Sequence, residues 1–266
     1  MRNILMTLCY IGTAYHGSQA QANALSITQV VQDAMETVLR RREDVKGCSR
    51  TDAGVHANRF CFNFLTENPI PLYALKRGLN AVLPEDIGVL DCREVPLDFH
   101  ARYSSVGKRY RYLIWNADGK NPFWKGRALE YWQPLDEEKM RRCCTLFLGT
   151  HDFGGFCSAK ADLSDTVRTI YRCEVDRQGD LVTFTVEGDG FLYHMVRILV
   201  GTLLRVSEGK IRLEQVRRAL EEKDRSLAGI TAPAHGLYLD EVFYERPESW
   251  DFPAKGEQSG PAAQPR

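Results

Sequence analysis

The residues best suited to chemistry lie in one short stretch, Gly47-Cys48-Ser49-Arg50-Thr51-Asp52-Ala53-Gly54-Val55-His56-Ala57. It holds an acid, a base, two hydroxyls and a histidine, and it has neither helical nor strand periodicity. This composition is typical of a functional loop. The sequence therefore predicts a functional loop over residues 47–57.

Within this loop, Arg50 and Asp52 are two residues apart and point to the same side of an extended segment. Arg50 would then help to keep Asp52 ionised, and an ionised carboxylate suits a nucleophile or a base. An exposed turn with a surface ion pair explains the same two residues, so the pair alone does not decide. His56, taken alone, is expected to be a hydrogen-bonded structural histidine.

The elements that must position this loop follow from hydrophobic periodicity. Alternation over residues 4–10 predicts a strand, and Ser26-x-x-Gln29 resembles a capping box before a helix of about fifteen residues. After the loop, the alternating Phe60, Phe62 and Phe64 predict a strand whose rings lie in the core. A short helix through residues 72–79 and a strand over 87–95 complete an α+β unit.

The second half has a similar order of elements, although the residues themselves do not repeat. The expected elements are a helix over 135–148, a hairpin of 167–177 with 181–187, a long helix over 190–207, a helix through 213–220 and a strand over 236–244. The predicted organisation is an N-terminal unit (1–106), a C-terminal unit (107–248) and a flexible tail (249–266).

Residues 99–112 carry four arginines or lysines and three tyrosines, and this stretch contains no acid. Basic side chains with interleaved aromatics suit an RNA surface. A strand with its tyrosines inward and its arginines outward has the same composition. Both explanations stay open from the residues.

Composition sets further bounds. The 266 residues contain 35 Lys and Arg and 35 Asp and Glu, so the chain lacks the strongly basic character of many nucleic-acid-binding proteins, although a local basic surface would suffice. The eight cysteines form no C-x-x-C pair, which favours buried reduced thiols, a cytoplasmic location and no metal site. No apolar run is long enough to span a membrane.

The loop resembles the catalytic signature of the TruA family of tRNA pseudouridine synthases, a small residue followed by Gly-Arg-Thr-Asp-x-Gly-Val-His-Ala, and the residues from Arg50 to His56 match it in order. The resemblance extends from about residue 2 to about residue 246. It includes the segments at residues 10–17, 79–84, 99–102, 108–112, 151–156, 191–201 and 235–239.

The resemblance implies the pseudouridine synthase fold, with two ferredoxin-like (RNP-like) α+β units whose antiparallel sheets are joined across a central cleft. It also implies isomerisation of uridine to pseudouridine at positions 38, 39 and 40 of the tRNA anticodon stem-loop, by a homodimer without cofactor or metal. By the resemblance, Asp52 is the nucleophile, Tyr110 stacks on the target uracil and is a candidate to remove the C5 proton, Arg197 pairs with the aspartate, and Arg50 handles the flipped nucleotide.

The chain departs from the family pattern at two positions in its first loop. Ile11 stands where the family usually has Asp, and Ser18 stands where it usually has Trp. Both are expected to lie outside the chemical core and to affect how RNA or a partner subunit is held. The alternatives are a synthase of the same fold that acts on another RNA and a catalytically silent RNA-binding protein. A metal-dependent nuclease is disfavoured because no carboxylate cluster suits two metals.

Overall fold

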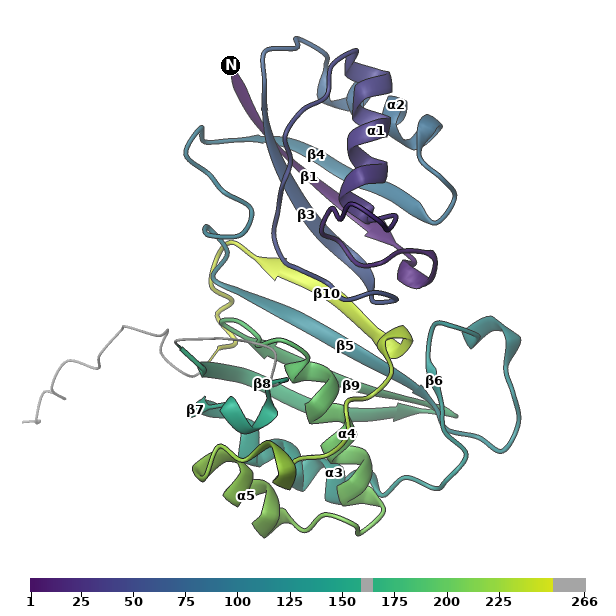
Figure 1. Cartoon of the computed structure of the whole chain (residues 1–266), viewed down its shortest axis with the longest axis vertical. Coiled ribbons are helices and arrows are strands. Elements are labelled where there is room, and N and C mark those ends of the chain that lie inside the picture. The colour runs from purple at the N-terminus through teal and green to yellow at the C-terminus, as the bar shows by residue number, and fades with distance from the viewer. Residues whose placement is uncertain (159–164, 251–266) are drawn as a thin grey trace, which may run out of the picture. The chain divides into compact units, whose positions relative to one another are not determined.

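The structure is a computed structural model that describes residues 1–158 and 165–250 (Figure 1). Its contacts divide the chain into two compact units. Unit 1 consists of residues 1–133, 178–183 and 233–245, and unit 2 consists of the described residues of 134–177, 184–232 and 246–250. Each unit contains both helices and strands, so the α+β prediction is confirmed.

Unit 1 begins with the elements that hold the functional loop. Its first strands are β1 (Arg2–Tyr10), β2 (Lys46–Gly47), β3 (His56–Thr66) and β4 (Ile87–Val95). They lie in the order β4-β1-β3, and β2 pairs with β3. All three pairings are antiparallel. The chain order β1-α1-β2-β3-α2-β4 with this strand order is ferredoxin-like, as predicted.

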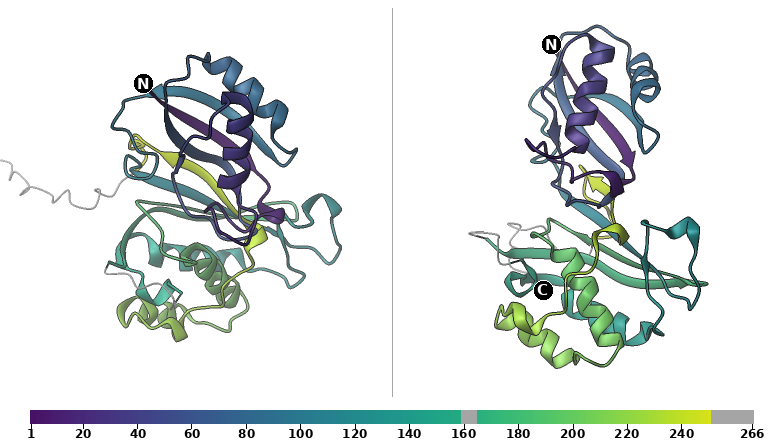
Figure 2. Two further views of the ribbon diagram at one scale, coloured as in Figure 1. Left: turned by 45° about the horizontal axis from the view of Figure 1, so that its top comes forward. Right: turned by 45° about the vertical axis from the view of Figure 1, so that its right-hand side comes forward.

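Helices α1 (Ile27–Leu39) and α2 (Leu72–Val82) lie side by side on one face of these strands (Figures 1 and 2). The predicted cap of α1 forms, since the Gln29 N–H donates to Ser26 Oγ at 3.2 Å. The rings of Phe60, Phe62 and Phe64 are buried as predicted. A helical pair on a sheet whose phenylalanines are buried is a rigid base for the loop between β2 and β3.

Strands β10 (Leu237–Phe243) and β5 (Gly107–Trp115) extend unit 1 beyond β3. β10 pairs with β3 in parallel at His56 and Ala57 and with β5 in antiparallel fashion. Tyr110 and Tyr112 of β5 are buried, whereas Arg109 and Arg111 are partly exposed. β5 is therefore a strand with its tyrosines inward and its arginines outward, which is the second of the two explanations given for residues 99–112.

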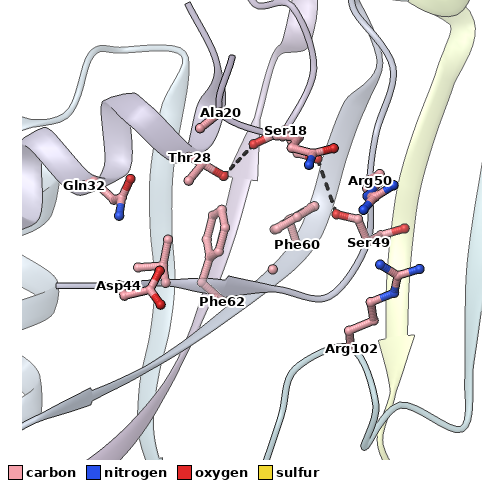
Figure 3. Close-up of a pocket in the computed structure, with 13 residues that line it drawn as sticks. Ser18, Ala20, Thr28, Gln32, Asp44, Ser49, Arg50, Phe60, Phe62 and Arg102 are labelled. Atoms are coloured by element: carbon pink, nitrogen blue, oxygen red, sulfur yellow. Dashed lines mark hydrogen bonds between the residues drawn. The ribbon is translucent and has the colours of Figure 1, made fainter. Parts of the chain in front are cut away.

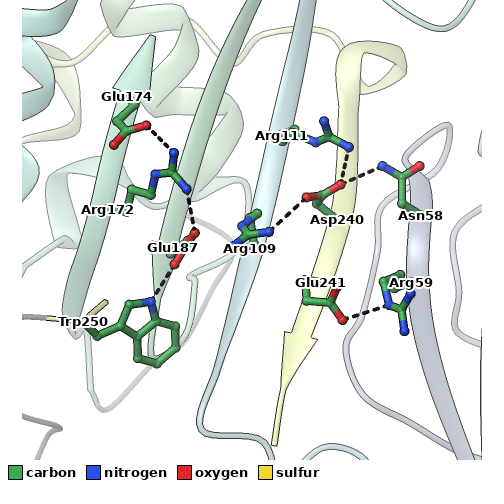
Figure 4. A network of polar contacts seen from close by, with 10 residues as sticks. All are labelled: Asn58, Arg59, Arg109, Arg111, Arg172, Glu174, Glu187, Asp240, Glu241 and Trp250. Carbon is green, nitrogen blue, oxygen red and sulfur yellow. Dashed lines mark hydrogen bonds and ion pairs between the residues drawn. The ribbon is translucent and has the colours of Figure 1, made fainter. Parts of the chain in front are cut away.

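A polar network holds β3, β10 and β5 together (Figure 4). Asn58 Nδ2 donates to Asp240 Oδ1 at 2.7 Å. Arg111 lies 2.5 Å and Arg109 3.7 Å from the carboxylate of the same Asp240. Because Asp240 is largely buried, its charge needs these partners, and the network fixes the strand that follows the functional loop.

In unit 2, strands β7 (Gly149–Asp152), β8 (Val167–Gln178) and β9 (Leu181–Gly188) are neighbours in that order, although Gln178 of β8 and residues 181–183 of β9 belong to unit 1. The helices are α3 (Glu137–Cys144), α4 (Met195–Ser207) and α5 (Leu213–Glu221). Apart from the additional β6 (Leu129–Glu130), β7 and α5, the order β5-α3-β8-β9-α4-β10 repeats that of the first unit along the chain. The prediction that the second unit of this repeat begins at residue 107 stays a prediction.

Two predicted helices are shorter than expected. The helix predicted over 135–148 is α3 followed by a 3-10 turn at Thr145–Phe147, and Asp136 caps its start by accepting from the Lys139 N–H at 3.0 Å. The helix predicted over 190–207 begins only at Met195. His194 has a φ of 61°, a left-handed conformation that a right-handed helix cannot contain.

Trp250 anchors the end of the described chain within unit 2 (Figure 4). It is 6% exposed, its ring stacks on Tyr171 at 4.0 Å, and its Nε1 donates to Glu187 Oε2 at 2.6 Å. The guanidinium of Arg246 lies over both rings. Ordered packing therefore reaches Trp250, inside the predicted tail of 249–266. Residues 251–266 lie outside the described part.

All eight cysteines are free; seven are buried, as predicted, and Cys9 is half-buried. Burial raises the pKa of the Cys48 thiol, which keeps it protonated. Within residues 1–158 and 165–250, no helix is long and apolar enough to cross a membrane. The same residues contain no group of three His, Cys, Asp or Glu side chains that could hold a metal ion.

Candidate active site

Residues 48–55 form the connection between β2 and β3, and a tight turn closes it. The Val55 N–H donates to the Asp52 carbonyl at 3.1 Å, and Gly54 between them has a φ of 78°. A turn with a positive φ at its third position favours glycine there, as in a type II turn. Gly54 therefore lets the chain reverse directly after Asp52, whose side chain is half-buried.

Thr51, the residue before Asp52, is held by contacts on three sides. Its N–H donates to Ser18 Oγ at 2.9 Å, and its carbonyl accepts from the Ser18 N–H at 3.2 Å. Its hydroxyl lies 2.9 Å from the hydroxyl of the buried Tyr10. The backbone that carries the Asp52 carboxylate is therefore fixed before any substrate arrives.

Ser18 is the centre of this clamp, and Figure 3 shows its contacts with Ser49 and Thr28. It is 2% exposed, and its hydroxyl donates to the Ser49 carbonyl at 3.3 Å while it accepts from Thr51. Its carbonyl accepts from both the N–H and the hydroxyl of Thr28 at the start of α1. The expectation that Ser18 lies outside the chemical core is therefore wrong, because its side chain holds the loop that carries Asp52.

We expect Ser18→Ala to slow the reaction and to leave RNA binding intact. The change leaves the buried Thr51 N–H without its acceptor, which costs about 1–3 kcal/mol and loosens the backbone before Asp52. Single-turnover measurements should show a rate constant lowered by about tenfold or more, while the Kd for tRNA changes less than about twofold.

The matched control is Thr28→Val, which removes the hydroxyl donor to the Ser18 carbonyl but leaves the Thr28 N–H and the contacts of Thr51 in place. This variant should keep the wild-type rate constant. Equal rate constants for Ser18→Ala and the wild type would contradict the role of Ser18.

His56 joins three segments of unit 1. Its Nδ1 accepts from the Gly12 N–H at 2.9 Å, so the ring is neutral and carries its proton on Nε2. Nε2 lies 2.9 Å from the His235 carbonyl and donates to it, and the ring packs on Tyr238 with centroids 4.6 Å apart. His56 is therefore a structural residue that fixes the first loop and β10 against β3.

This arrangement makes stability depend on pH. Burial lowers the pKa of His56 below its ordinary value of 6.5, because desolvation disfavours the charged ring, and only the neutral ring can accept from the Gly12 N–H. Below pH 6.5 the unfolded chain binds a proton that the folded protein resists, so the free energy of unfolding should fall as the pH drops from 6.5 toward the lowered pKa.

Urea unfolding at pH 8 and at pH 5.5 measures this effect. In His56→Gln, which cannot titrate, the loss of stability between the two pH values should be smaller than in the wild type. The same loss in both proteins would show that His56 does not cause it.

Tyr110 of β5 lies beside the loop. Its hydroxyl is 3.2 Å from Ser49 Oγ, and the residue is 7% exposed. Burial raises the pKa of Tyr110, and the nearby charge of Asp52 raises it further. The phenol is therefore protonated at neutral pH and close enough to Asp52 to sense its charge.

Arg50 is exposed and makes no hydrogen bond or ion pair through its side chain within the described residues. The ion pair with Asp52 that the spacing suggested is therefore not formed. Arg50 instead lines a hollow of about 330 Å³ together with Arg102 (Figure 3). Phe60 and Phe62 also line this hollow.

Arg197 lies in unit 2, in the first turn of α4. Its Nε donates to the Ala232 carbonyl at 2.7 Å, and its own carbonyl accepts from the Ala232 N–H at 3.0 Å. The guanidinium thus has a set direction within unit 2. Its pairing with Asp52 stays a prediction.

The site also contains Tyr10 and Thr51, to which the sequence assigned no role, and Ser18, which was expected only to affect how RNA or a partner subunit is held. Tyr10 and Ser18 are far from the loop along the chain, so no periodicity in the loop could reveal them. The residue type that could have indicated this contact between the two loops is Gly17. Its φ is 87°, and a Cβ there would lie 2.3 Å from the Thr51 carbonyl. A glycine in this first loop marks a close approach of two backbones.

Comparison with known proteins shows the class. A family model described as tRNA pseudouridine synthase matches residues 7–104 and 143–245. Asp52, Arg50 and Arg197 lie inside the matched ranges, and Tyr110 lies between them. The chain belongs to the tRNA pseudouridine synthase family, whose members are RNA-modifying isomerases.

Curated relatives narrow the family to the TruA type. The chain is 44% identical over 244 residues to tRNA pseudouridine synthase A of Acetivibrio thermocellus, covering 92% of this chain and 100% of the relative. It is 45% identical to the enzyme of the same name from Clostridium kluyveri, with the same coverage, and 44% identical to that of Exiguobacterium sibiricum, covering 94% and 98%. The protein is therefore an enzyme that makes pseudouridine in tRNA.

Solved structures give a weaker likeness. A chain of a Cbf5-Nop10-Gar1 complex superposes with a TM-score of 0.37 at 13% identity, covering 89% of this chain and 48% of that one. A chain of the archaeal box H/ACA sRNP Nop10-Cbf5 complex gives a TM-score of 0.33 at 14% identity, covering 84% and 59%. No argument below depends on these superpositions.

Proposed function

We propose that the enzyme isomerises uridines 38, 39 and 40 of the tRNA anticodon stem-loop and that Asp52 is its nucleophile. The observation that carries the second point is the clamp on Thr51, which fixes the backbone of the loop directly before a half-buried carboxylate. Membership of the TruA type supports the choice of uridines.

Isomerisation must break the N1–C1′ bond, turn the uracil and form a bond between C5 and C1′. An ionised carboxylate can start this by attack on C6 of the base or on C1′ of the ribose, which splits one difficult step into easier ones. Because the loop is already fixed by Ser18 and Tyr10, little ordering remains to be done when the substrate binds.

The remaining site residues have supporting roles in this proposal. Tyr110 stacks on the uracil once the base has been flipped out of the stem. Because burial keeps its phenol protonated, Tyr110 can take up the C5 proton only after it has given up its own proton. Arg50, exposed beside the hollow, handles the flipped nucleotide through its phosphate. Arg197 pairs with Asp52 and keeps it ionised.

The test is tritium release from tRNA labelled at uridine C5, followed by mapping of pseudouridine in the product. Release with product at positions 38 to 40 supports the proposal. Product elsewhere in tRNA or in another RNA would support the alternative of a synthase with a different target. Tight RNA binding without tritium release from any RNA would instead support the alternative of a catalytically silent RNA-binding protein.

The oligomeric state and the cellular location of the enzyme are part of the same proposal. We expect a homodimer that shares one tRNA, in accordance with the family resemblance, and sedimentation of the free enzyme measures this. The eight free and mostly buried thiols fit a reducing compartment such as the cytoplasm.

A further inference from the structure

The loop of residues 116–133, which joins β5 to α3, carries an unusual combination of side chains (Figure 1). Phe123 is 79% exposed and Trp132 is 75% exposed. Residues 119–129 contain Lys120, Lys125 and Arg127 and no acid, while the exposed Asp118 and Glu130 flank this stretch. Single exposed apolar residues are common, but two large exposed aromatics with three cations on one loop of a tRNA enzyme suggest a use.

The tip of this loop is ordered by its own hydrogen bonds. Phe123 lies in the 3-10 turn η2 (Pro122–Trp124), and its N–H donates to Asn121 Oδ1 at 3.1 Å. The Trp124 N–H donates to the Asn121 carbonyl at 3.0 Å, and Lys125 closes the turn on Pro122. A ring on a capped turn can be stacked upon at a small cost in conformational entropy.

The base of the loop is tied to the neighbourhood of the catalytic loop, all within unit 1. The Tyr238 hydroxyl donates to the Arg127 carbonyl at 2.6 Å, and the Thr13 hydroxyl donates to the Gly126 carbonyl at 3.2 Å. The Tyr238 ring packs on His56, four residues after Asp52. The loop therefore has a fixed position relative to the segment that carries the nucleophile.

The charges on the loop favour RNA over protein as its partner. Lys120, Lys125 and Arg127 make no ion pair through their side chains within the described residues. Unpaired cations attract phosphates, and an exposed aromatic ring offers a stacking face to an unstacked base. The matched ranges of the family model stop at residue 104 and resume at 143, so the family match assigns nothing to this loop.

We propose that the loop of residues 116–133 is a docking surface for the tRNA substrate, with phosphates on Lys120 and Lys125 and one unstacked base on the ring of Phe123. The proposal rests on the activity on tRNA and deepens the proposed function. It places RNA contacts on an element separate from the catalytic loop and from residues 99–112.

The test compares Phe123→Ala and the double variant Lys120→Ala/Lys125→Ala with the wild type. Binding of purified tRNA is measured at several salt concentrations, and the single-turnover rate constant is measured at saturating enzyme. All three side chains are exposed, so these changes do not threaten the fold. Leu97→Ala, at a position that is also exposed in unit 1, is the matched control.

We expect Phe123→Ala to weaken tRNA binding by about tenfold, the size of a lost stacking contact. The double variant should lower the slope of log K against log salt by about 2, one for each phosphate contact. Both should keep the wild-type rate constant at saturation, since neither touches Asp52. Leu97→Ala should bind tRNA as the wild type does.

An unchanged Kd and salt slope in both variants would overturn the proposal. So would a change in sedimentation with unchanged tRNA binding, because the loop would then lie at a protein interface. If the wild type modifies an RNA position other than 38 to 40 and the variants still lose affinity for that RNA, only the proposed target fails.

Discussion

Replacing Asp52 with alanine should abolish tritium release from tRNA labelled at uridine C5, with a loss of at least about 10⁴-fold in the single-turnover rate constant. Removal of a covalent nucleophile leaves only positioning and binding to assist the reaction. The Kd for tRNA should stay within about tenfold of the wild type, because phosphate contacts dominate RNA affinity.

Asp52→Asn is the matched variant, since it keeps the size and the polar character of the side chain but removes the negative charge. It should be as inactive as Asp52→Ala, and both should show the wild-type melting temperature within a few degrees, because the loop is held by Thr51 and Ser18. Isomerisation by either variant at a rate near that of the wild type would eliminate Asp52 as the nucleophile.

Gly17→Ala should be among the most damaging small substitutions in unit 1. Gly17 has a φ of 87°, and a Cβ there would lie 2.3 Å from the Thr51 carbonyl. The left-handed backbone and the clash together should lower the free energy of unfolding by about 2–4 kcal/mol. Because the clash pushes on the residue before Asp52, the rate constant of the remaining folded protein should also fall by about tenfold or more.

Gly209→Ala separates the two causes. Gly209 has a φ of 72°, and nothing lies within 4 Å of the position where its Cβ would be. This variant should lose only about 1–2 kcal/mol from backbone strain and should keep the wild-type rate constant. If Gly17→Ala behaved in the same way as Gly209→Ala in urea unfolding and in turnover, the close approach to Thr51 would have no catalytic role.

Much of the fold could be predicted because its signals are local. Ser26 and Gln29 mark the start of α1 within four residues, and the alternation of Phe60 and Phe62 marks β3. The late start of α4 could not be predicted, since the left-handed His194 leaves no trace in the hydrophobic pattern. Burial of Trp250 was missed for a related reason: a single aromatic in a polar segment has no periodicity.

The loop residues of the candidate site could be predicted from their own stretch of sequence, whereas Tyr110 and Arg197 were named only through the family resemblance. Arg50, Asp52 and His56 stand together in the sequence, so the resemblance found them at once. Ser18 was misjudged because its contact with Thr51 joins two loops that are 33 residues apart. Long-range hydrogen bonds of this kind depend on the folded chain path and not on residue type.

The buried indole of Trp250 also bears on how this gene tolerates change at its end. A stop codon at position 247 would remove the stacked ring and leave Glu187, which is buried, without its indole donor. A stop codon at position 251 would spare both contacts. Selection should therefore conserve an aromatic donor at Trp250. A chain that ends at residue 246 should be less stable than a chain that ends at residue 250, although the two differ by only a few residues.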